Sequence, residues 1–269
     1  MSVSHKQQMR SSKLFFNDRA KALPPALGLA DLCYASGRDA RLWLRPGIYN
    51  DLIESLREQL DLTLEHSLLE VGCAVGFVAT GIAPYCLRYT GVDLAPAAID
   101  RAKALGLVNT DFRVADAMSL PFPDYSFDRA LCQDVITNFS SLAMVEKLLS
   151  EMIRVVIPGG RVLVGSIPDD ECKAQYHERT HEVTAALQQQ EGPAFIPTAS
   201  PAGIGMRLTQ WILRRLGRIE PAISCYYFRR EDFVRIGAAL QCQVSLEDIH
   251  PLNPYRGYRF NAIYTKGQE

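Results

Sequence analysis

Five short apolar runs, separated by stretches long enough to form helices, dominate residues 67–168. In chain order the runs read SLLEVG, YTGVDL, DFRVAD, FDRALCQ and GRVLVGSI. Strands that alternate with helices form parallel sheets whose connections are right-handed crossovers. Parallel strands are buried on both faces, so they are nearly continuous in apolar residues, as LLEVG and VLVGSI are. This stretch therefore predicts an α/β core with a parallel sheet.

The segments on either side of the core follow a different pattern. Before it, Ile48, Leu52, Leu56 and Leu60 recur every four residues and predict a helix over residues 48–62. After it come a polar helix, a Gly/Pro-rich stretch and a second amphipathic helix with arginines opposite its apolar face; a helix and two strands then return to the sheet. We therefore expect four regions: an N-terminal helical segment (1–66), the core (67–168), an inserted helical cap (169–225, with its second helix at 207–219) and the C-terminal part of the sheet (226–269).

Composition narrows the possible environments and partners. The chain has 269 residues, 48% of them hydrophobic, with 29 Lys and Arg against 30 Asp and Glu. A balance this close to neutral argues against a broad basic face for nucleic acid. The seven cysteines are scattered, the N-terminus is polar, and no apolar run is long enough to span a membrane. We expect a reduced, cytoplasmic protein without stable membrane insertion.

The first strand ends in a small-residue turn that enters a helix, LLEVGCAVGFVA. Small residues at such a turn allow a ligand to approach the backbone. About twenty residues later the second strand ends in Asp93, whose carboxylate can accept hydrogen bonds from both hydroxyls of a ribose. Together these features predict an adenosine-binding site.

The turn also distinguishes between nucleoside cofactors. The strict G-x-G-x-x-G pattern of dinucleotide sites is absent, and the turn reads E-x-G-x-A-x-G from Glu70 to Gly76. A carboxylate at Glu70 would repel a pyrophosphate, but it could face the ammonium group of an amino acid. This favours S-adenosylmethionine over NAD.

Residues 67–168 resemble the class I S-adenosylmethionine-dependent methyltransferases, in particular those that act on small molecules. The resemblance rests on five ordered blocks: EVGCAVG, GVDLAP, ADAM, LPFPDYSFD and EMIRVVIPGG. It implies a Rossmann-like sheet of seven strands in the order 3-2-1-4-5-7-6. It also implies that Asp116 accepts from the adenine amino group and that Ala117 offers its backbone N–H. The implied cofactor residues are Glu70, Gly72, Cys73, Ala74, Gly76, Asp93, Leu94, Asp116, Ala117 and Gln133.

The chain departs from the family pattern at two places. Ala74 stands where the family usually has the middle glycine of the turn. Thr137 and Asn138 follow the fourth strand where many relatives carry a histidine. A histidine base from that position is therefore excluded.

Methyl transfer to a small molecule is an in-line displacement that depends mainly on how the acceptor is positioned, so a general base is optional. Asp134, at the end of the fourth strand, and His177 and His181 in the cap are the catalytic candidates. Tyr34 and Tyr49 are the candidates for closing the site over the substrate. The large flanking segments favour an enclosed acceptor of natural-product or sugar type, with oxygen slightly favoured as the acceptor atom.

His177 to His181 also spell H-E-x-x-H, a zinc motif when it lies on a helix. No third ligand is suitably spaced, so we interpret the segment as part of a lid and expect no metal. Two other functions stay open from the sequence alone. One is an NAD-dependent oxidoreductase, and the other is a protein that binds S-adenosylmethionine without catalysis.

Overall fold

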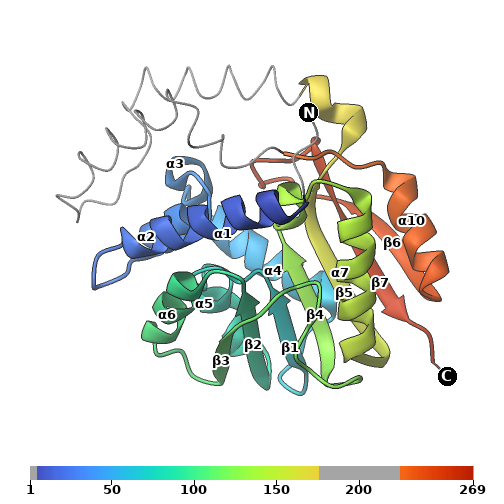
Figure 1. Ribbon diagram of the computed structural model, residues 1–269, viewed down its shortest axis with the longest axis horizontal. Coiled ribbons are helices and arrows are strands. Elements are labelled where there is room, and N and C mark those ends of the chain that lie inside the picture. The colour runs from blue at the N-terminus through green and yellow to red at the C-terminus, as the bar shows by residue number, and fades with distance from the viewer. Residues whose placement is uncertain (1–4, 176–224, 269) are drawn as a thin grey trace.

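The computed structural model describes residues 5–175 and 225–268, and its centre is one seven-stranded sheet (Figure 1). The helices are α1 (His5–Lys21), α2 (Leu29–Ala35), α3 (Ala40–Trp43), α4 (Ile48–Leu60), α5 (Ala79–Ile82), α6 (Pro96–Ala104), α7 (Leu142–Val155) and α10 (Arg230–Ala239). The strands are β1 (Ser67–Val71), β2 (Arg88–Asp93), β3 (Thr110–Val114), β4 (Phe127–Gln133), β5 (Val156–Pro168), β6 (Cys242–Asp248) and β7 (Arg259–Lys266).

The strand order β3-β2-β1-β4-β5-β7-β6 confirms the order that the resemblance implied. The five strands foreseen in residues 67–168 are parallel to one another, and β7 pairs antiparallel with both β5 and β6. Parallel strands present their carboxyl ends at one edge of the sheet. Residues that follow β1, β2 and β4 therefore lie near one another at this edge, although β1 ends at Val71 and β4 at Gln133.

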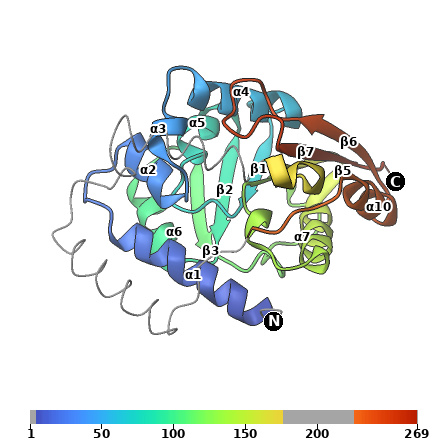
Figure 2. The ribbon, with the colours of Figure 1, turned by 90° about the horizontal axis from the view of Figure 1, so that it is seen from above.

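Helices cover both faces of the sheet, as Figure 2 shows for α4 and α5 on one side and α7 on the other. Successive residues of a strand point to opposite faces. In β1, Leu68 packs with the helices of the α4 side, whereas Leu69 packs with α7 and α10. In β5, Leu163 and Val164 divide in the same way. The continuous apolar runs of the strands thus contribute to two hydrophobic cores, one on each face of the sheet.

The N-terminal helices extend the α4 core and reach the carboxyl edge of the sheet. α4 ends at Leu60, two residues earlier than the spacing of leucines predicted, because Asp61 adopts a left-handed conformation (φ +48°) and caps it. α1 packs against α6, where the Asn17 side chain accepts a hydrogen bond from the Ala97 N–H at 2.9 Å. Gln8, near the other end of α1, donates to the Asn138 carbonyl oxygen at 2.6 Å. α1 therefore lies across the edge where β1, β2 and β4 end.

The chain leaves and rejoins the sheet at one place. Phe228 forms a parallel bridge with Asp169, and its N–H donates to the Pro168 carbonyl oxygen at 2.9 Å. Most of the expected cap, including His177, His181 and the helix at 207–219, lies outside the described residues. The four-region division remains a prediction.

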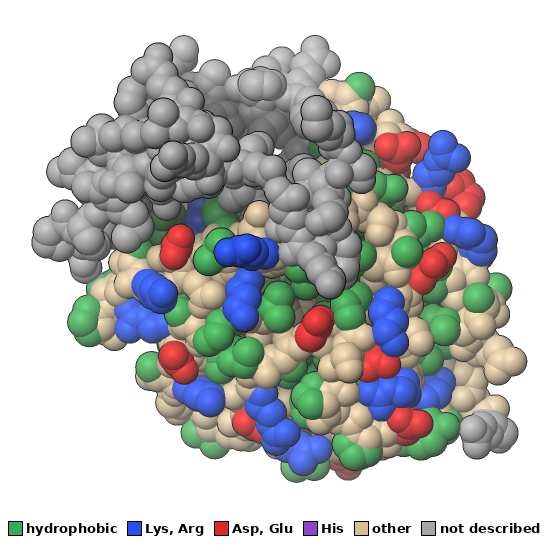
Figure 3. All heavy atoms as spheres, viewed as in Figure 1, with side chains coloured by type: hydrophobic (Ala, Val, Ile, Leu, Met, Phe, Trp, Pro, Cys, Tyr) green, Lys and Arg blue, Asp and Glu red, His purple; other side chains and the backbone are tan. Residues whose placement is uncertain are grey.

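On the face in Figure 3, basic and acidic side chains are interspersed among the residues that the structure describes. Within residues 5–175 and 225–268, no helix has both the length and the apolar character needed to cross a bilayer.

Candidate active site

The turn after β1 is built from three residues with positive φ. Gly72, Ala74 and Gly76 have φ values of +85°, +46° and +88°. The Gly72 N–H donates to the Val92 carbonyl oxygen at 2.7 Å, which ties the turn to β2. A Cβ on Gly72 would lie 2.3 Å from Cγ2 of Val135, so this position requires glycine. Ala74 takes the left-handed conformation without that freedom, which is unusual for a residue with a Cβ.

Asp93 joins this turn to the end of β2. One carboxylate oxygen accepts from the Ala74 N–H at 3.0 Å, and the other accepts from the Ala95 N–H at 2.8 Å. Each carboxylate oxygen can accept two hydrogen bonds. Asp93 is therefore oriented by the backbone and keeps accepting capacity for a ligand.

Glu70 is buried inside the sheet with 2% of its surface exposed. The Tyr89 hydroxyl donates a hydrogen bond to its carboxylate. Removal from water raises the pKa of Glu70 to about 7, because burial disfavours the charged form more than Tyr89 and the nearby Arg38 favour it. A cationic group beside Glu70 would compensate for this cost.

Two cavities open beside these residues under α1. The first, of about 50 Å³, is lined by Glu70, Gly72, Ala74, Asp93 and, from the N-terminal region, Arg38. The second, of about 80 Å³, is mostly apolar. The two cavities are adjacent, because both are lined by Gly72, Asp93, Val135, Asn138 and Phe16 of α1; together they are called the cleft at the carboxyl edge of the sheet.

Eight of the ten predicted cofactor residues line this cleft: Glu70, Gly72, Cys73, Ala74, Asp93, Leu94, Ala117 and Gln133. The other two lie beside it. Asp116 is exposed and its carboxylate accepts from the Met118 N–H at 2.9 Å, while Gly76 packs closely against Leu105. Their roles toward a cofactor stay predictions.

Asp134 follows β4 in a left-handed conformation (φ +62°) and lies between two arginines. Arg259 of β7 forms an ion pair with one carboxylate oxygen, and Arg38 lies 3.4 Å from the other. Arg259 also donates to the Ser166 hydroxyl at 3.0 Å. Two guanidinium groups stabilise the ionised carboxylate and occupy its lone pairs, so this surrounding does not favour a general base.

The two tyrosines expected at the substrate have other contacts. The Tyr49 hydroxyl donates to the Phe77 carbonyl oxygen at 2.9 Å and lies 2.7 Å from the Thr80 hydroxyl. The Tyr34 ring lies 4.4 Å from the Arg19 guanidinium. Neither tyrosine lines the cleft, so these positions supply no support for their predicted role. His177 and His181 lie outside the described residues.

Sequence reasoning missed Arg38, Arg259 and the α1 residues that cover the cleft, Lys13 and Phe16. No motif surrounds these residues, because they come from segments remote from the glycine turn. A signal was present only for Arg38: it is the sole arginine in a stretch, residues 30–38, that is otherwise small or apolar except for Asp31.

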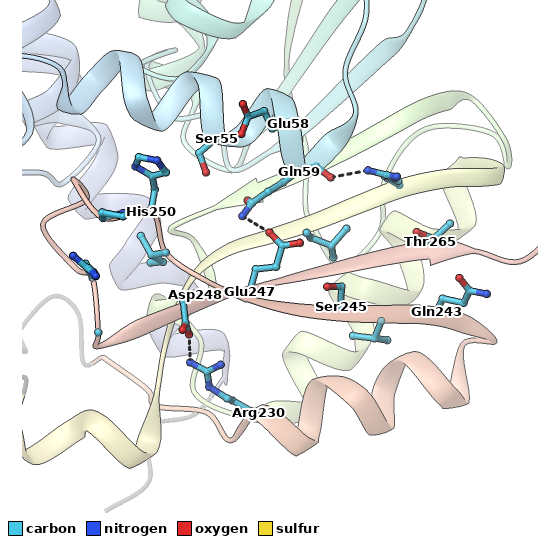
Figure 4. A pocket seen from close by; sticks show the side chains of 17 residues that line it. Ser55, Glu58, Gln59, Arg230, Gln243, Ser245, Glu247, Asp248, His250 and Thr265 are labelled. Carbon is cyan, nitrogen blue, oxygen red and sulfur yellow. Dashed lines mark hydrogen bonds and ion pairs between the residues drawn. The ribbon is translucent and has the colours of Figure 1, made fainter.

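A larger groove of about 920 Å³ lies elsewhere, on the open face of β6 and β7 beside α4 (Figure 4). Two hydrogen bonds link polar side chains within it. Gln59 donates to Glu247 at 2.9 Å, and Arg230 donates to Asp248 at 2.8 Å. None of the predicted site residues lines this groove.

Among residues 5–175 and 225–268, no group of three or more His, Cys, Asp or Glu side chains is arranged to hold a metal ion. The cysteines nearest the cleft are unsuited to nucleophilic chemistry. Burial raises the pKa of Cys73 and of Cys132 well above the ordinary value for a thiol.

Residues 69–164 match a family model described as a methyltransferase domain. The chain is 35% identical over 126 residues to methyltransferase GfsG of Streptomyces halstedii, a match that covers 43% of each protein. It is 34% identical over 104 residues to norajmaline N-methyltransferase of Rauvolfia serpentina, covering 36% of this chain and 35% of that one. The matches to the first curated relatives span between 31% and 56% of those proteins.

The fold extends beyond the matched segment. A solved structure of DhpI in complex with SAH superimposes with a TM-score of 0.60 at 18% identity, covering 99% of this chain and all of that one. Phosphoethanolamine N-methyltransferase 1 of Haemonchus contortus gives a TM-score of 0.61 at 11% identity, covering 99% of this chain and 50% of that chain. At these identities the likeness concerns the fold.

Proposed function

We propose that this chain, whose residues 69–164 form a methyltransferase domain of the class I fold, transfers a methyl group from S-adenosylmethionine to a small molecule. One observation carries the proposal: the order of chemical environments along the cleft. Glu70 lies at one end, Asp93 in the middle, and the apolar second cavity at the other end. An amino-acid ammonium, a ribose and an adenine follow one another in the same order in S-adenosylmethionine.

Each environment suits its group for a physical reason. A buried carboxylate at Glu70 is compensated by a cation, and the oriented carboxylate of Asp93 can accept from vicinal hydroxyls. The second cavity has walls from Val92, Leu94 and Phe139, which suit a flat aromatic base. A pyrophosphate would have to lie beside Glu70 instead, so the site disfavours NAD.

The cleft is narrow as the structure presents it. Its two cavities measure about 50 and 80 Å³, whereas pockets for ligands of this size measure about 300 Å³ or more. Lys13 and Phe16 of α1 line the covering wall. The two cavities therefore account for only part of the volume that the cofactor needs.

When bound, S-adenosylmethionine would supply an electrophilic methyl group, and the chain would contribute orientation and exclusion of water. Among the described residues the nearest candidate base, Asp134, is held by two arginines. An acceptor that reacts without a protein base, such as an amine or an ionised hydroxyl, fits this arrangement.

For the acceptor we propose a molecule of natural-product or sugar type, with oxygen slightly favoured as the acceptor atom. The relatives include norajmaline N-methyltransferase and the sterol 4-C-methyltransferase strm-1 of Caenorhabditis elegans, so they do not select one acceptor atom.

A thermal-shift comparison of S-adenosylhomocysteine, S-adenosylmethionine and NAD tests the cofactor. A ligand present at a hundred times its dissociation constant stabilises the folded state by about 2.7 kcal/mol. We expect a shift of several degrees with the two adenosyl ligands and none with NAD. A shift with NAD alone would replace the methyltransferase proposal with the oxidoreductase.

Substituting Asp93 tests the ribose contact. Asp93→Ala should weaken S-adenosylhomocysteine binding at least tenfold, or about 1.4 kcal/mol. Asp128→Ala is a matched control, since its carboxylate also accepts a backbone N–H, that of Ser67 at 2.8 Å, but at the opposite edge of the sheet. Calorimetric titration should show unchanged affinity for the control. Equal losses in both variants would mean that Asp93 acts only through folding.

Detection of S-adenosylhomocysteine release with a panel of small acceptors distinguishes an enzyme from a non-catalytic binding protein. Turnover with any acceptor establishes catalysis. Tight cofactor binding without turnover across amines, phenols and sugars would favour the binding protein.

A further inference from the structure

We infer that β6 forms an interface between two copies of this chain, in which the two β6 strands pair antiparallel and join the two sheets into one. This surface is separate from the cleft, which lies at the carboxyl ends of β1, β2 and β4. β6 is one edge of the sheet, with β7 as its single neighbour (Figure 2). In the described part of the chain, the backbone of β6 hydrogen-bonds only to β7. The polar groups on its other side are therefore available to a further strand.

β6 lacks the features that usually protect a sheet edge from pairing. Natural edge strands are very short, are interrupted by a bulge, or carry proline or lysine. β6 pairs with β7 over all of Cys242–Asp248 without a shift in register. It contains no proline, lysine or arginine, and its two acidic residues stand at its end. The opposite edge, β3, is shorter and carries the exposed ion pair of Asp111 and Arg113. Of the two edges, β6 is therefore the one suited to a partner strand.

The sequence of β6 is complementary to itself in the antiparallel direction. A two-fold axis between the two Ser245 residues pairs the whole strand with its copy. Val244 then lies opposite Leu246 of the second copy, and the Gln243 amide lies opposite the Glu247 carboxylate of the second copy. Apolar pairs and donor–acceptor pairs both stabilise a sheet, and symmetry repeats each of them. The two Glu247 side chains are about 13 Å apart along the strands, whereas parallel pairing in register would place them side by side.

α10, which packs on one face of β6, adds an apolar side chain beside the same edge. Phe233 is buried against the sheet, and Arg235 reaches α7, where it lies 3.9 Å from Glu146. At about 100° per residue, Val234 lies on the flank of α10 that faces away from α7, toward the open edge. This valine is 49% exposed. Antiparallel pairing places both α10 helices on one face of the joined sheet, so each Val234 is directed toward the other copy and loses contact with water.

Sedimentation velocity over a hundredfold range of concentration tests the interface in the unaltered chain. The mean mass should rise from that of one chain to that of two, because antiparallel pairing about a two-fold axis closes at the dimer. A chain that stays monomeric at every concentration would overturn the inference. A mass that continues to rise beyond two chains would also overturn it, since that would require an interface that does not close.

Two lysine substitutions on one face of β6 should act in opposite directions. Gln243 and Ser245 are both exposed, on the side of β6 away from α10 (Figure 4). Ser245→Lys places two like charges opposite each other at the axis and should weaken dimerisation at least threefold. Gln243→Lys is the matched control: it adds the same charge, but opposite Glu247 of the second copy, and should strengthen dimerisation at least twofold. Effects of the same sign would mean that net charge alone matters, and the inference would be wrong.

Cross-linking tests the register of the two strands. Opposite residues of an antiparallel pair have Cα atoms about 4.5 or 5.5 Å apart, and both separations allow a disulfide. Mild oxidation should therefore convert Ser245→Cys into a covalent dimer, as seen on denaturing gels without reductant. Gln243→Cys should cross-link no more than the wild-type chain, whose own cysteines set the background. Equal cross-linking of the two variants, or cross-linking of Gln243→Cys alone, would overturn the inference; neither result would bear on the proposed methyl transfer.

Discussion

The two walls of the cleft are built in contrasting ways. On the β1–β2 side, the turn from Gly72 to Gly76 and the carboxylate of Asp93 are ordered by nearby backbone groups. On the β4–β5 side, Asp134 is ordered by charged side chains, Arg38 and Arg259, that come from opposite parts of the chain. The first wall depends on local chain geometry, and the second depends on long-range ion pairing.

The same contrast separates two acids of the cleft, the buried Glu70 and the half-buried Asp134. Glu70 has a single neutral donor, Tyr89, and burial raises its pKa to about 7. Asp134 is contacted by the guanidinium groups of Arg38 and Arg259, which balance its negative charge. Glu70 is thus the acid that lacks a full partner, and the cleft beside it is where a cationic ligand group would be favoured.

Removing the Asp134 carboxylate should have the largest effect on stability. Asp134→Asn suits the left-handed backbone but leaves two arginines without their counter-charge, at a cost of about 3 to 5 kcal/mol. The control is Asp111→Asn, which breaks an exposed pair with Arg113 and should cost less than about 1 kcal/mol. Urea denaturation measures both. A loss below 1 kcal/mol in Asp134→Asn would show that this carboxylate is free enough to act as a base.

Adding a methyl group at Gly72 tests how far the β1–β2 wall depends on local backbone geometry. Gly72→Ala combines a left-handed backbone with a Cβ placed 2.3 Å from Val135, and should cost about 2 to 5 kcal/mol. Gly106 also has positive φ (+62°) but has no atom within 4 Å of its Cβ position. Gly106→Ala should therefore cost only about 1 to 2 kcal/mol. Equal melting temperatures for the two variants would contradict the close approach of Val135.

This difference in construction also explains what the sequence could reveal. The strands and the glycine turn with Glu70 and Asp93 are each formed by contiguous residues, so hydrophobic periodicity and motif spacing are sufficient to predict them. Arg38 and Arg259 are over two hundred residues apart and meet only because β7 inserts beside β5. A single sequence contains no local pattern for such a pair. The contacts of the Tyr49 hydroxyl could not be predicted for a related reason: the sequence of a helix does not show which backbone carbonyl an aromatic side chain will reach.

The pH dependence of stability in Glu70→Gln tests whether the buried Glu70 carboxylate lacks a charged partner. The folded-state pKa of about 7 exceeds the ordinary value of 4.5, so the folded chain binds more protons than the unfolded chain between these values. The wild-type free energy of unfolding should then fall as the pH rises from 4.5 to 7, by up to about 3 kcal/mol. Glu70→Gln should be more stable than wild type at pH 8 and nearly equal at pH 4.5, as measured by thermal unfolding.

The same variant should bind S-adenosylhomocysteine more weakly, because a neutral amide attracts an ammonium group less strongly than a carboxylate does. 5′-Methylthioadenosine has the nucleoside and the sulfur of the cofactor but no amino-acid group. It serves as the control ligand, and its affinity should not change. Stability that follows the same pH curve in both proteins would show that Glu70 is not the titrating group.

The smallest effect is expected at Ala74, where the methyltransferases that the chain resembles usually have a glycine. Ala74→Gly removes the cost of a left-handed conformation for a residue with a Cβ, which is about 1 to 2 kcal/mol. Glycine also has greater freedom in the unfolded chain, which lowers the gain in folding stability by about 0.4 to 1 kcal/mol. The net gain should be no more than about 1.5 kcal/mol. Gln241→Gly provides the comparison, since Gln241 is an exposed residue with φ +56° far from the cleft. Both variants should gain similar stability in denaturant, whereas only Ala74→Gly, which enlarges the cavity beside Asp93, should change the affinity for S-adenosylhomocysteine. A loss of stability in Ala74→Gly alone would mean that the alanine methyl contributes packing to the turn, and the local wall would then depend on side-chain contacts as the β4–β5 wall does.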